Sequence, residues 1–390
     1  RSAGFTVEQA ARKIDRPEEE IVGWESGELK PSLAQVRKAS EVYKRPLAVF
    51  FLPEPPQDFA TLQDFRSLPA EIPREYTPNL RFLIRRTRAR QEWLRDFLQS
   101  QNHPPLGFIG SARPSDNPSK LAQQIRDSIG ITRNDIQHCR TREDALRLWV
   151  SRAETSGVFV FRAGNMRWEK IDVVEARGFA LSDKYAPFVF LNAQDAKAAQ
   201  VFTLAHELVH VWLDASGVSN LRTVMKPATQ ADKIEVFCNK VAAEMLVPRD
   251  VFQERWEQQD TSKPLDERIS SQSEYFKVSE WVIARRLLDW GKISKTKYDE
   301  LTEGYDRQWR DLRQREKESQ KERQPERRPS PYRLKLINNG YAFSSLLLSA
   351  YQGGDISGRD VSSLLGVKLN KIANFAELIG IPVKWRRSPA

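Results

Sequence analysis

The chain has 390 residues and a formal net charge of +10, from 62 lysines and arginines against 52 acidic residues. This length exceeds one ordinary hydrophobic core and predicts two or three domains. Two cysteines fit a reducing cytoplasm, and no apolar run approaches the roughly 18–20 residues that span a bilayer. Membrane proteins, disulfide scaffolds and disordered chains are thereby excluded. The first residues lack a signal peptide's form, so we expect a cytoplasmic protein.

Residues 1–52 predict a unit of short helices. Thr6 is a favourable N-cap for the first helix, and Gly27 ends the second. An apolar segment at 47–52 closes the unit, and the prolines that begin at Pro53 mark a linker.

Residues 53–150 predict a helical connecting region that is rich in arginine. The arginines between Arg81 and Arg95 alternate with apolar side chains. We interpret them as a solvated helix face with apolar stems, and contact with a nucleic-acid backbone is the alternative.

Residues 151–305 combine strands with long apolar helices. Val, Phe and Ile gather in short runs between turn residues, which predicts strands at Gly157–Arg162, Ile171–Val174, Arg177–Leu181 and Phe188–Asn192. Helices are expected at Ala196–Asp214 and Asp232–Leu246. The fold class is therefore α+β and mainly helical, with a small sheet in this domain.

The last part of the chain divides into a linker and a small module. The 23 residues from Asp306 to Arg328 carry 15 charges and cannot cover a core. We therefore expect residues 306–331 to form a charged helix and linker, and residues 332–390 to form a small helical module.

Two of the four histidines lie in one motif, His206-Glu207-Leu208-Val209-His210. Chance would give this pattern roughly 0.003 times in such a chain. Residues i and i+4 lie one above the other on a helix, so both imidazoles can reach one metal ion. Glu207 lies beside them, where it can take a proton from a metal-bound water.

The helix around the motif is apolar nearly all round and is therefore expected to be buried. Burying His206, Glu207 and His210 without partners would cost several kcal/mol, which a metal would offset. Two alternatives stand beside a catalytic metal: core histidines bonded to nearby carbonyls, and a closed structural zinc site.

The following helix offers a third ligand. Glu235 and Asn239 lie four residues apart on one face, which suits a carboxylate ligand and a polar partner of a ligand. Glu244 lies about half a turn round the helix axis from Glu235 and therefore faces the opposite side of the helix. Asp232 is a weaker competitor. We therefore predict a zinc site, with manganese as an alternative.

The strand Phe188–Asn192 directly precedes the motif helix. We expect it to lie at the lip of a cleft, where an exposed edge could pair with an extended substrate. Tyr185 and Tyr275 are candidates to stabilise an oxyanion, without geometry to choose between them.

The run AQVFTLAHELVHVWL followed by IEVFCNKVAAEMLVP resembles the ImmA/IrrE (DUF955) metallopeptidase family. That resemblance implies a zincin-like, gluzincin-type peptidase domain with His206, His210 and Glu235 as metal ligands and Glu207 as general base. Cys238 and Val241 depart from the family pattern without touching a ligand. Asp64-Phe65-Arg66 and the segment 276–288 are also similar to longer family members.

Residues 1–52 resemble the helix-turn-helix of XRE/Cro-type regulators, without its usual first helix. The helix expected to face DNA begins with Glu18, Glu19 and Glu20, which would repel a polyanion. We therefore favour a protein-docking unit, and the sequence leaves open whether it binds DNA.

The resemblance implies a cytoplasmic zinc endopeptidase that cleaves an XRE-type repressor and relieves repression in a stress or mobile-element response. The alternative is a DNA-binding transcriptional regulator or toxin–antitoxin partner whose metal site is structural or vestigial.

Overall fold

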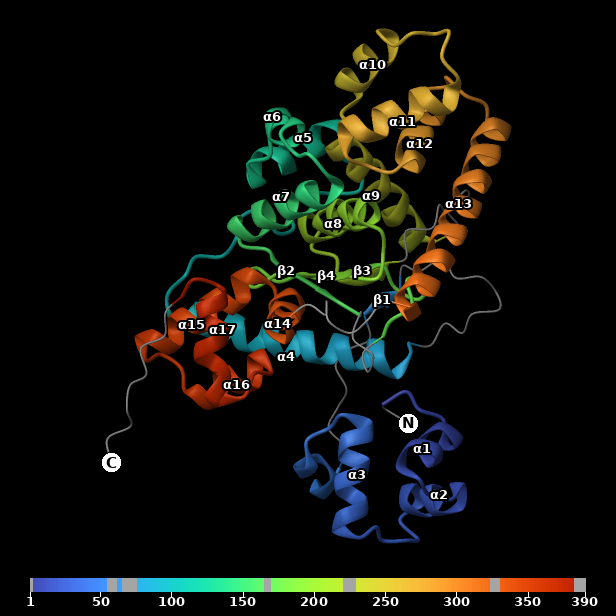
Figure 1. The fold of residues 1–390 in the computed structure, drawn as a ribbon. Helices are drawn as coiled ribbons and strands as arrows, with labels where there is room; N and C mark the ends of the chain where they lie inside the picture. Colours follow the sequence, from blue (N-terminus) through green and yellow to red (C-terminus); the bar gives the residue numbers. More distant parts are fainter. Residues whose placement is uncertain are drawn as a thin grey trace.

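A computed structural model describes residues 3–54, 62–64, 76–164, 170–219, 229–322 and 330–381 (Figure 1). In these ranges the chain is mainly helical around one five-stranded sheet, so the α+β prediction is confirmed at this level. Phe65 and Arg66 of the family-like segment lie outside the described residues. None of the helices in these ranges combines the length and apolar character that crossing a bilayer requires.

The N-terminal unit has three helices and a 3-10 turn around its own small core. They are α1 (Val7–Ile14), α2 (Glu18–Ser26), α3 (Leu33–Tyr43) and η1 (Leu47–Phe51). Thr6 caps α1 as predicted, with its side chain accepting from the Gln9 amide at 3.1 Å. Gly27 ends α2 with φ of 83°. The helix-turn-helix assignment itself stays a prediction.

The sheet has the strand order β1-β5-β3-β4-β2. Its strands are β1 (Gln63–Asp64), β2 (Phe159–Ala163), β3 (Gly178–Leu181), β4 (Phe188–Asn192) and β5 (Gly217–Ser219). Strand β3 is antiparallel to both of its neighbours, whereas β2 runs parallel to β4 and β1 parallel to β5. Three of the four predicted strands are therefore confirmed.

Two expectations about the sheet are wrong. Residues 171–174 form no strand, because the Asp172 carboxylate accepts from the Val174 amide at 2.9 Å and its carbonyl accepts from the Glu175 amide at 3.0 Å, which closes a turn. Strand β4 offers no exposed edge either, since it lies between β3 and β2 and all its residues are buried. Its backbone groups are already paired on both sides, so it cannot add a substrate strand.

Alternating side chains of the sheet serve two different cores. In β4, Phe188 and Phe190 face the core shared with α4 (Pro78–Ser100) and the C-terminal helices, whereas Val189 and Leu191 face the core shared with α8 (Lys197–Trp212). Helices α5 (Pro118–Ile129), α7 (Arg142–Thr155) and α9 (Gln230–Leu246) complete the second layer. Figure 1 shows the two helical layers on opposite faces of the sheet.

The remaining described elements extend these layers. They are α6 (Arg133–Gln137), α10 (Arg249–Glu257), α11 (Leu265–Phe276), α12 (Glu280–Asp289), α13 (Lys295–Glu322), α14 (Pro331–Asn339), α15 (Tyr341–Gly353), α16 (Gly358–Leu365), η3 (Leu369–Lys371) and α17 (Ile372–Leu378). Part of the predicted 306–331 linker and the end of the 332–390 module lie outside the described residues. The predicted domain boundaries stay predictions, although side chains as far apart in the chain as Leu62 and Ile379 belong to the α4-side core.

Helix α4 connects the sheet with both ends of the chain, so its arginines are not simply a solvated face. Arg90 is 6% exposed and donates to Asn339 Oδ1 and to the Leu364 carbonyl, both at 2.7 Å. Arg85 donates to the Lys44 carbonyl of the N-terminal unit at 3.2 Å. These donors stabilise contacts within the chain, which weakens the interpretation of the run as a nucleic-acid surface.

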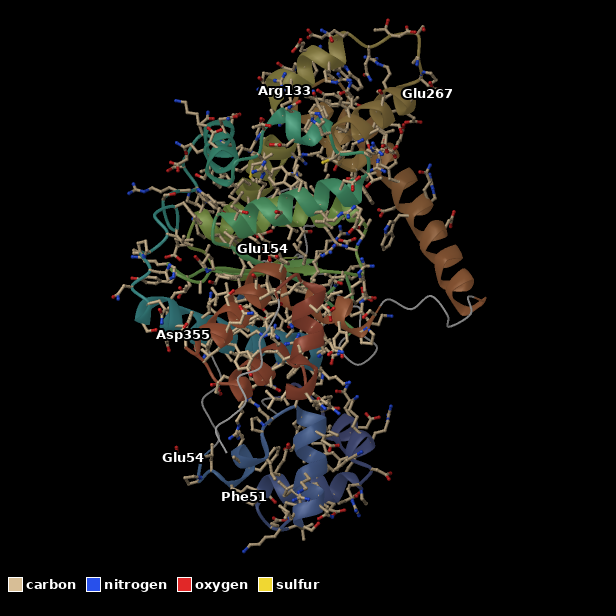
Figure 2. The ribbon with its side chains drawn as sticks, turned by 60° about the vertical axis from the view of Figure 1, so that its left-hand side comes forward. Phe51, Glu54, Arg133, Glu154, Glu267 and Asp355 are labelled. Atoms are coloured by element: carbon tan, nitrogen blue, oxygen red, sulfur yellow. The ribbon has the colours of Figure 1, made fainter. Side chains whose placement is uncertain are left out.

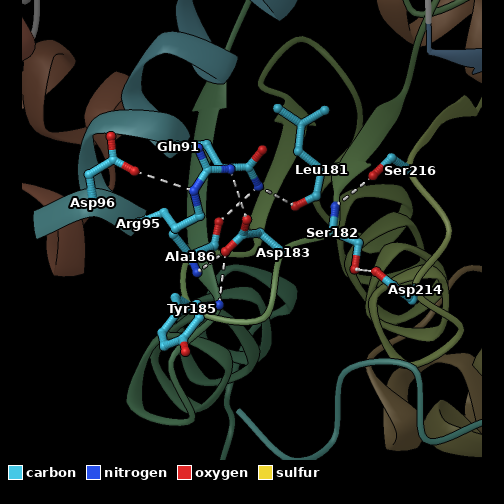
Figure 3. Close-up of polar contacts among 10 residues, drawn as sticks. All are labelled: Gln91, Arg95, Asp96, Leu181, Ser182, Asp183, Tyr185, Ala186, Asp214 and Ser216. Carbon is cyan, nitrogen blue, oxygen red and sulfur yellow. Dashed lines mark hydrogen bonds and ion pairs between the residues drawn. The ribbon is translucent and has the colours of Figure 1, made fainter. Parts of the chain in front are cut away.

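A polar network holds the turn between β3 and β4 (Figure 3). Gln91 of α4 donates to the carbonyls of Leu181 and Ala186 at 2.8 and 2.9 Å. The Ser182 hydroxyl donates to Asp214, which follows α8, and the Ser182 amide donates to Ser216, which precedes β5. The network therefore fixes the connection through which α8 leads into β5.

Glu154 connects α7 with the start of α15, between the two helical layers (Figure 2). Its carboxylate accepts from the Ala342 amide at 3.1 Å. Gly340 precedes that amide with φ of 80°, and a Cβ there would lie 2.3 Å from the Val160 carbonyl oxygen, so only glycine fits. Burial raises the pKa of Glu154 to about 7, although the amides of Ala342 and Tyr341 oppose the rise.

We predict that Glu154 makes stability depend on pH. Its pKa is higher in the folded chain, about 7, than its ordinary value of 4.5, so its contribution is complete below pH 4.5 and is lost as pH rises through 7. Glu154→Gln should remove this loss, which amounts to up to about 3 kcal/mol. Urea unfolding of both proteins between pH 4 and 8 measures it, and parallel pH profiles would contradict the prediction.

Candidate metal centre

Helix α8 carries the His-Glu motif through the interior of the molecule. It packs between strands β3 and β4 on one side and helices α7 and α9 on the other. Apolar side chains cover it nearly all round, which is why the three polar side chains of the motif are buried: His206 and Glu207 are 0% exposed and His210 is 1% exposed. The burial expected from the sequence is confirmed.

The two imidazoles and the Glu235 carboxylate converge on one point. Glu235 comes from α9 and is 3% exposed. Its Oε1 lies 2.9 Å from His210 Nε2 and its Oε2 lies 3.4 Å from His206 Nε2, while the two Nε2 atoms are 3.0 Å apart. The structure thus brings together the residues that the sequence predicted as ligands.

This donor set fits a divalent ion. Ligands at about 2.0–2.2 Å from a tetrahedral ion lie roughly 3.3–3.6 Å from one another, close to the separations observed among these three side chains. Two histidines and one glutamate are also the ligand set of catalytic zinc sites that keep an open position. All candidate ligand atoms lie within 4.8 Å of one another. The fit supports a metal here without selecting zinc over manganese.

Asn239 contacts one of the imidazoles. Its Oδ1 lies 3.0 Å from His206 Nδ1. An amide oxygen only accepts, so Nδ1 carries the hydrogen and Nε2 of His206 keeps its lone pair for the metal. The spacing of Glu235 and Asn239 on α9 predicted this pair of neighbours, and their roles stay a proposal.

The other acids of α9 have different partners. Asp232 accepts from the Thr229 amide at 2.8 Å and caps the helix. Glu244 forms an ion pair with Arg286 of α12 at 2.7 Å, where both side chains are nearly buried. Among the three acids that the sequence offered, only Glu235 faces the imidazoles.

Burial and mutual contacts shift the pKa values of Glu235, His206 and His210. Burial alone would raise the pKa of Glu235, but His206 and His210 outweigh it and lower that pKa to about 2. For His206, burial opposes the charged form and the Glu235 carboxylate favours it, with a raised pKa as the result. Burial lowers the pKa of His210. The two imidazoles thus keep the buried Glu235 carboxylate ionised.

Glu207 lies beside this cluster with its carboxylate unpaired. Neither of its oxygens has a hydrogen-bond partner among the described residues. Burial raises its pKa to about 8, and the charge of Glu235 adds to the rise. An unpaired buried carboxyl next to the ligands is what a proton acceptor for a bound water requires.

Two other side chains from the sequence analysis are not part of the cluster. Tyr185 packs with the α4-side core, in the turn between β3 and β4. Tyr275 of α11 contacts Gln137 and the Arg255 guanidinium. Neither position supports a role at the metal, so the oxyanion candidates are not supported.

Sequence reasoning missed Gly178 and Ser219, which lie against Glu207. Gly178 is the partner of Ser219 in the pairing of β3 with β5. The two are 41 positions apart, and nothing in their local sequence signals the contact, because it arises from strand register.

Residues 155–288 match the model of the family described as Peptidase_M78, IrrE N-terminal-like domain. The matched segment contains β2 to β5 together with α8 and α9, and hence every residue of the centre. It supports the ImmA/IrrE resemblance and a function of the metallopeptidase type, which implies a metal and a protein substrate. No curated protein matches the chain.

We predict that Glu235→Gln lowers metal binding, whereas Glu244→Gln lowers stability and leaves metal binding intact. Loss of a ligand should weaken metal binding more than roughly 100-fold, since even a partner of a ligand is worth about 10–100-fold. Glu244→Gln should keep the metal and lose up to about 3 kcal/mol of stability, because Arg286 stays buried without its partner.

Elemental analysis of both purified variants and urea unfolding measure these effects. Full metal content in Glu235→Gln, or its loss in a folded Glu244→Gln protein, would contradict the ligand set.

Proposed function

We propose that this chain is a zinc-dependent endopeptidase. The observation that carries the proposal is the buried cluster of His206, His210 and Glu235, with the unpaired Glu207 carboxylate one residue from a ligand. The match of the surrounding domain to a peptidase family supports it. A structural zinc site would not need an unpaired acid at its side, which favours a catalytic role.

In the proposed mechanism the chain's side chains have three roles. His206, His210 and Glu235 would hold the ion, and Asn239 would keep the His206 ring in its binding orientation. A bound zinc ion would supply a Lewis acid for the scissile carbonyl and would lower the pKa of water toward about 7. Glu207 accepts the proton of the attacking water on a carboxylate oxygen and donates it to the leaving amine.

The burial of the centre favours this chemistry. The side chains of the centre are only 0–3% exposed, so electrostatic interactions among them act in a medium of low dielectric constant. They are His206, Glu207, His210 and Glu235. The chain therefore places a carboxylate without a competing partner beside fixed ligands, which suits the transfer of a proton from the attacking water.

We further propose that the substrate is a repressor of the XRE type, whose cleavage relieves repression in a stress or mobile-element response. The support is the family resemblance of the peptidase domain and the XRE-like pattern of residues 1–52. Glu18 and Glu19 are exposed in the first turn of α2, which disfavours contact with DNA. The N-terminal unit is therefore better suited to hold a protein than a duplex.

Glu207→Gln tests the chemistry. The amide keeps the size of the side chain but cannot accept a proton, so cleavage should fall by about 10²–10⁴-fold while metal content and melting temperature stay unchanged. The assay incubates the metal-loaded protein with a purified XRE-type repressor and follows its fragments by mass spectrometry. Cleavage at parental rate by the variant would refute the role of Glu207.

Removal of residues 1–52 tests the docking role. These residues have their own core, so the remaining chain should keep its metal and its activity on an unstructured peptide. Cleavage of the folded repressor should fall at least tenfold, because the substrate is no longer held near the centre. Unchanged capture and cleavage of the repressor by the shortened chain would assign docking to another surface.

A further inference from the structure

The sheet side of Glu207 is formed by Gly178 of β3 and Ser219 of β5. The two residues are register partners in adjacent antiparallel strands. Strand β3 packs against α8, and the Arg177 amide donates to the Ser219 carbonyl at 3.1 Å. The pairing of β3 with β5 therefore fixes the backbone of Gly178 and Ser219 next to the Glu207 carboxylate.

Gly178 provides the space that the carboxylate occupies. A Cβ on this residue would lie 2.9 Å from Glu207 Oε1, 2.5 Å from the Thr203 methyl group and 3.0 Å from the Phe190 carbonyl oxygen. Such contacts are too short for any side chain. The absence of a Cβ lets β3 approach α8 closely enough for Glu207 to lie against the sheet.

Ser219 provides a hydroxyl at the same place. It is 0% exposed, and its Oγ, like both oxygens of Glu207, has no hydrogen-bond partner among the described residues. Register partners in adjacent strands place their Cβ positions on the same face of the sheet, about 4.5–5.5 Å apart, and the Gly178 Cβ position faces Glu207, so the Ser219 hydroxyl lies beside the carboxylate. A buried unpaired donor beside a buried unpaired acceptor is unfavourable for both, and a hydrogen bond between them would remove that cost.

The connection before β5 keeps Ser219 in position. Ser216 accepts from the Ser182 amide at 2.8 Å, and Asp214 accepts from the Ser182 hydroxyl at 2.7 Å (Figure 3). These contacts fix the chain between the end of α8 and β5. The same network therefore restrains the short segment that connects the end of α8 with the strand of Ser219.

We propose that Ser219 is a positioning residue for the general base: its hydroxyl donates a hydrogen bond to one oxygen of Glu207 and leaves the other oxygen for the proton of the attacking water, in the space that Gly178 provides. This inference rests on the proposed peptidase function and extends it. Ser219 touches neither metal nor substrate in this role. Its effect passes entirely through the orientation of Glu207.

Ser219→Ala and Ser219→Thr separate the hydroxyl from packing, and Ser344→Ala is the matched control. Ser344 is equally buried and lies in α15. With an unstructured fluorogenic peptide, Ser219→Ala should lower kcat roughly 10- to 100-fold at unchanged KM and metal content, the range of one hydrogen bond to a charged group. Ser219→Thr should recover most of kcat, and Ser344→Ala should leave it unchanged.

Infrared difference spectroscopy on the metal-free proteins provides a readout that needs no activity. Subtracting the spectrum of Glu207→Gln from that of the parent identifies the Glu207 carboxyl band. Loss of the Ser219 donor should shift this band in Ser219→Ala and not in Ser344→Ala. Since neither metal nor substrate is present, this arm tests the contact even if the parent cleaves no peptide, in which case the peptidase proposal fails separately.

Three results would overturn the inference. One is a kcat of Ser219→Ala within twofold of an active parent. Another is an equal loss in Ser219→Ala and Ser219→Thr at unchanged melting temperature, which would assign the effect to packing. The third is an identical Glu207 band in the parent and in Ser219→Ala, which would show that no hydrogen bond joins the two side chains.

Discussion

A carboxylate and two imidazoles buried within 4.8 Å of one another are the arrangement on which the rest of the structure depends. Ionised groups lose solvation when buried, so they persist in a core only where they compensate one another or bind an ion. Glu235 is held charged by His206 and His210, and Asn239 satisfies the remaining nitrogen of one ring. The apolar helix α8 can cross the interior with polar side chains because α9 supplies these partners.

The centre also needs a rigid frame, which comes from elements distant in sequence. Helix α4 lies on the opposite face of the sheet, yet Gln91 holds the turn between β3 and β4, and that turn holds the connection from α8 to β5. Arg90 joins the same helix to the C-terminal helices. Gln91 and Arg90 reach backbone carbonyls through buried or partly buried hydrogen bonds, which fix positions more strictly than apolar packing does.

Patterns of short range were sufficient for much of the site. The spacing of His206 and His210 needs only a helix, as does the pairing of Glu235 with Asn239, and helical periodicity is visible in the apolar residues around them. The same holds for the capping of α1 by Thr6. Glu244 could be excluded as a ligand because it faces the opposite side of the helix from Glu235, and its ion pair with Arg286 agrees with that orientation.

What the amino-acid sequence by itself determined was therefore the three side chains that converge in the candidate centre, the buried motif helix and three of the strands, which depend mainly on residues a few positions apart. Only the tertiary structure decided that β4 is an interior strand, that residues 171–174 form a turn, and that Gly178 and Ser219 flank Glu207. Strand order and register bring together residues far apart in the chain. No local periodicity encodes them, because they follow from how the two helical layers pack on the sheet.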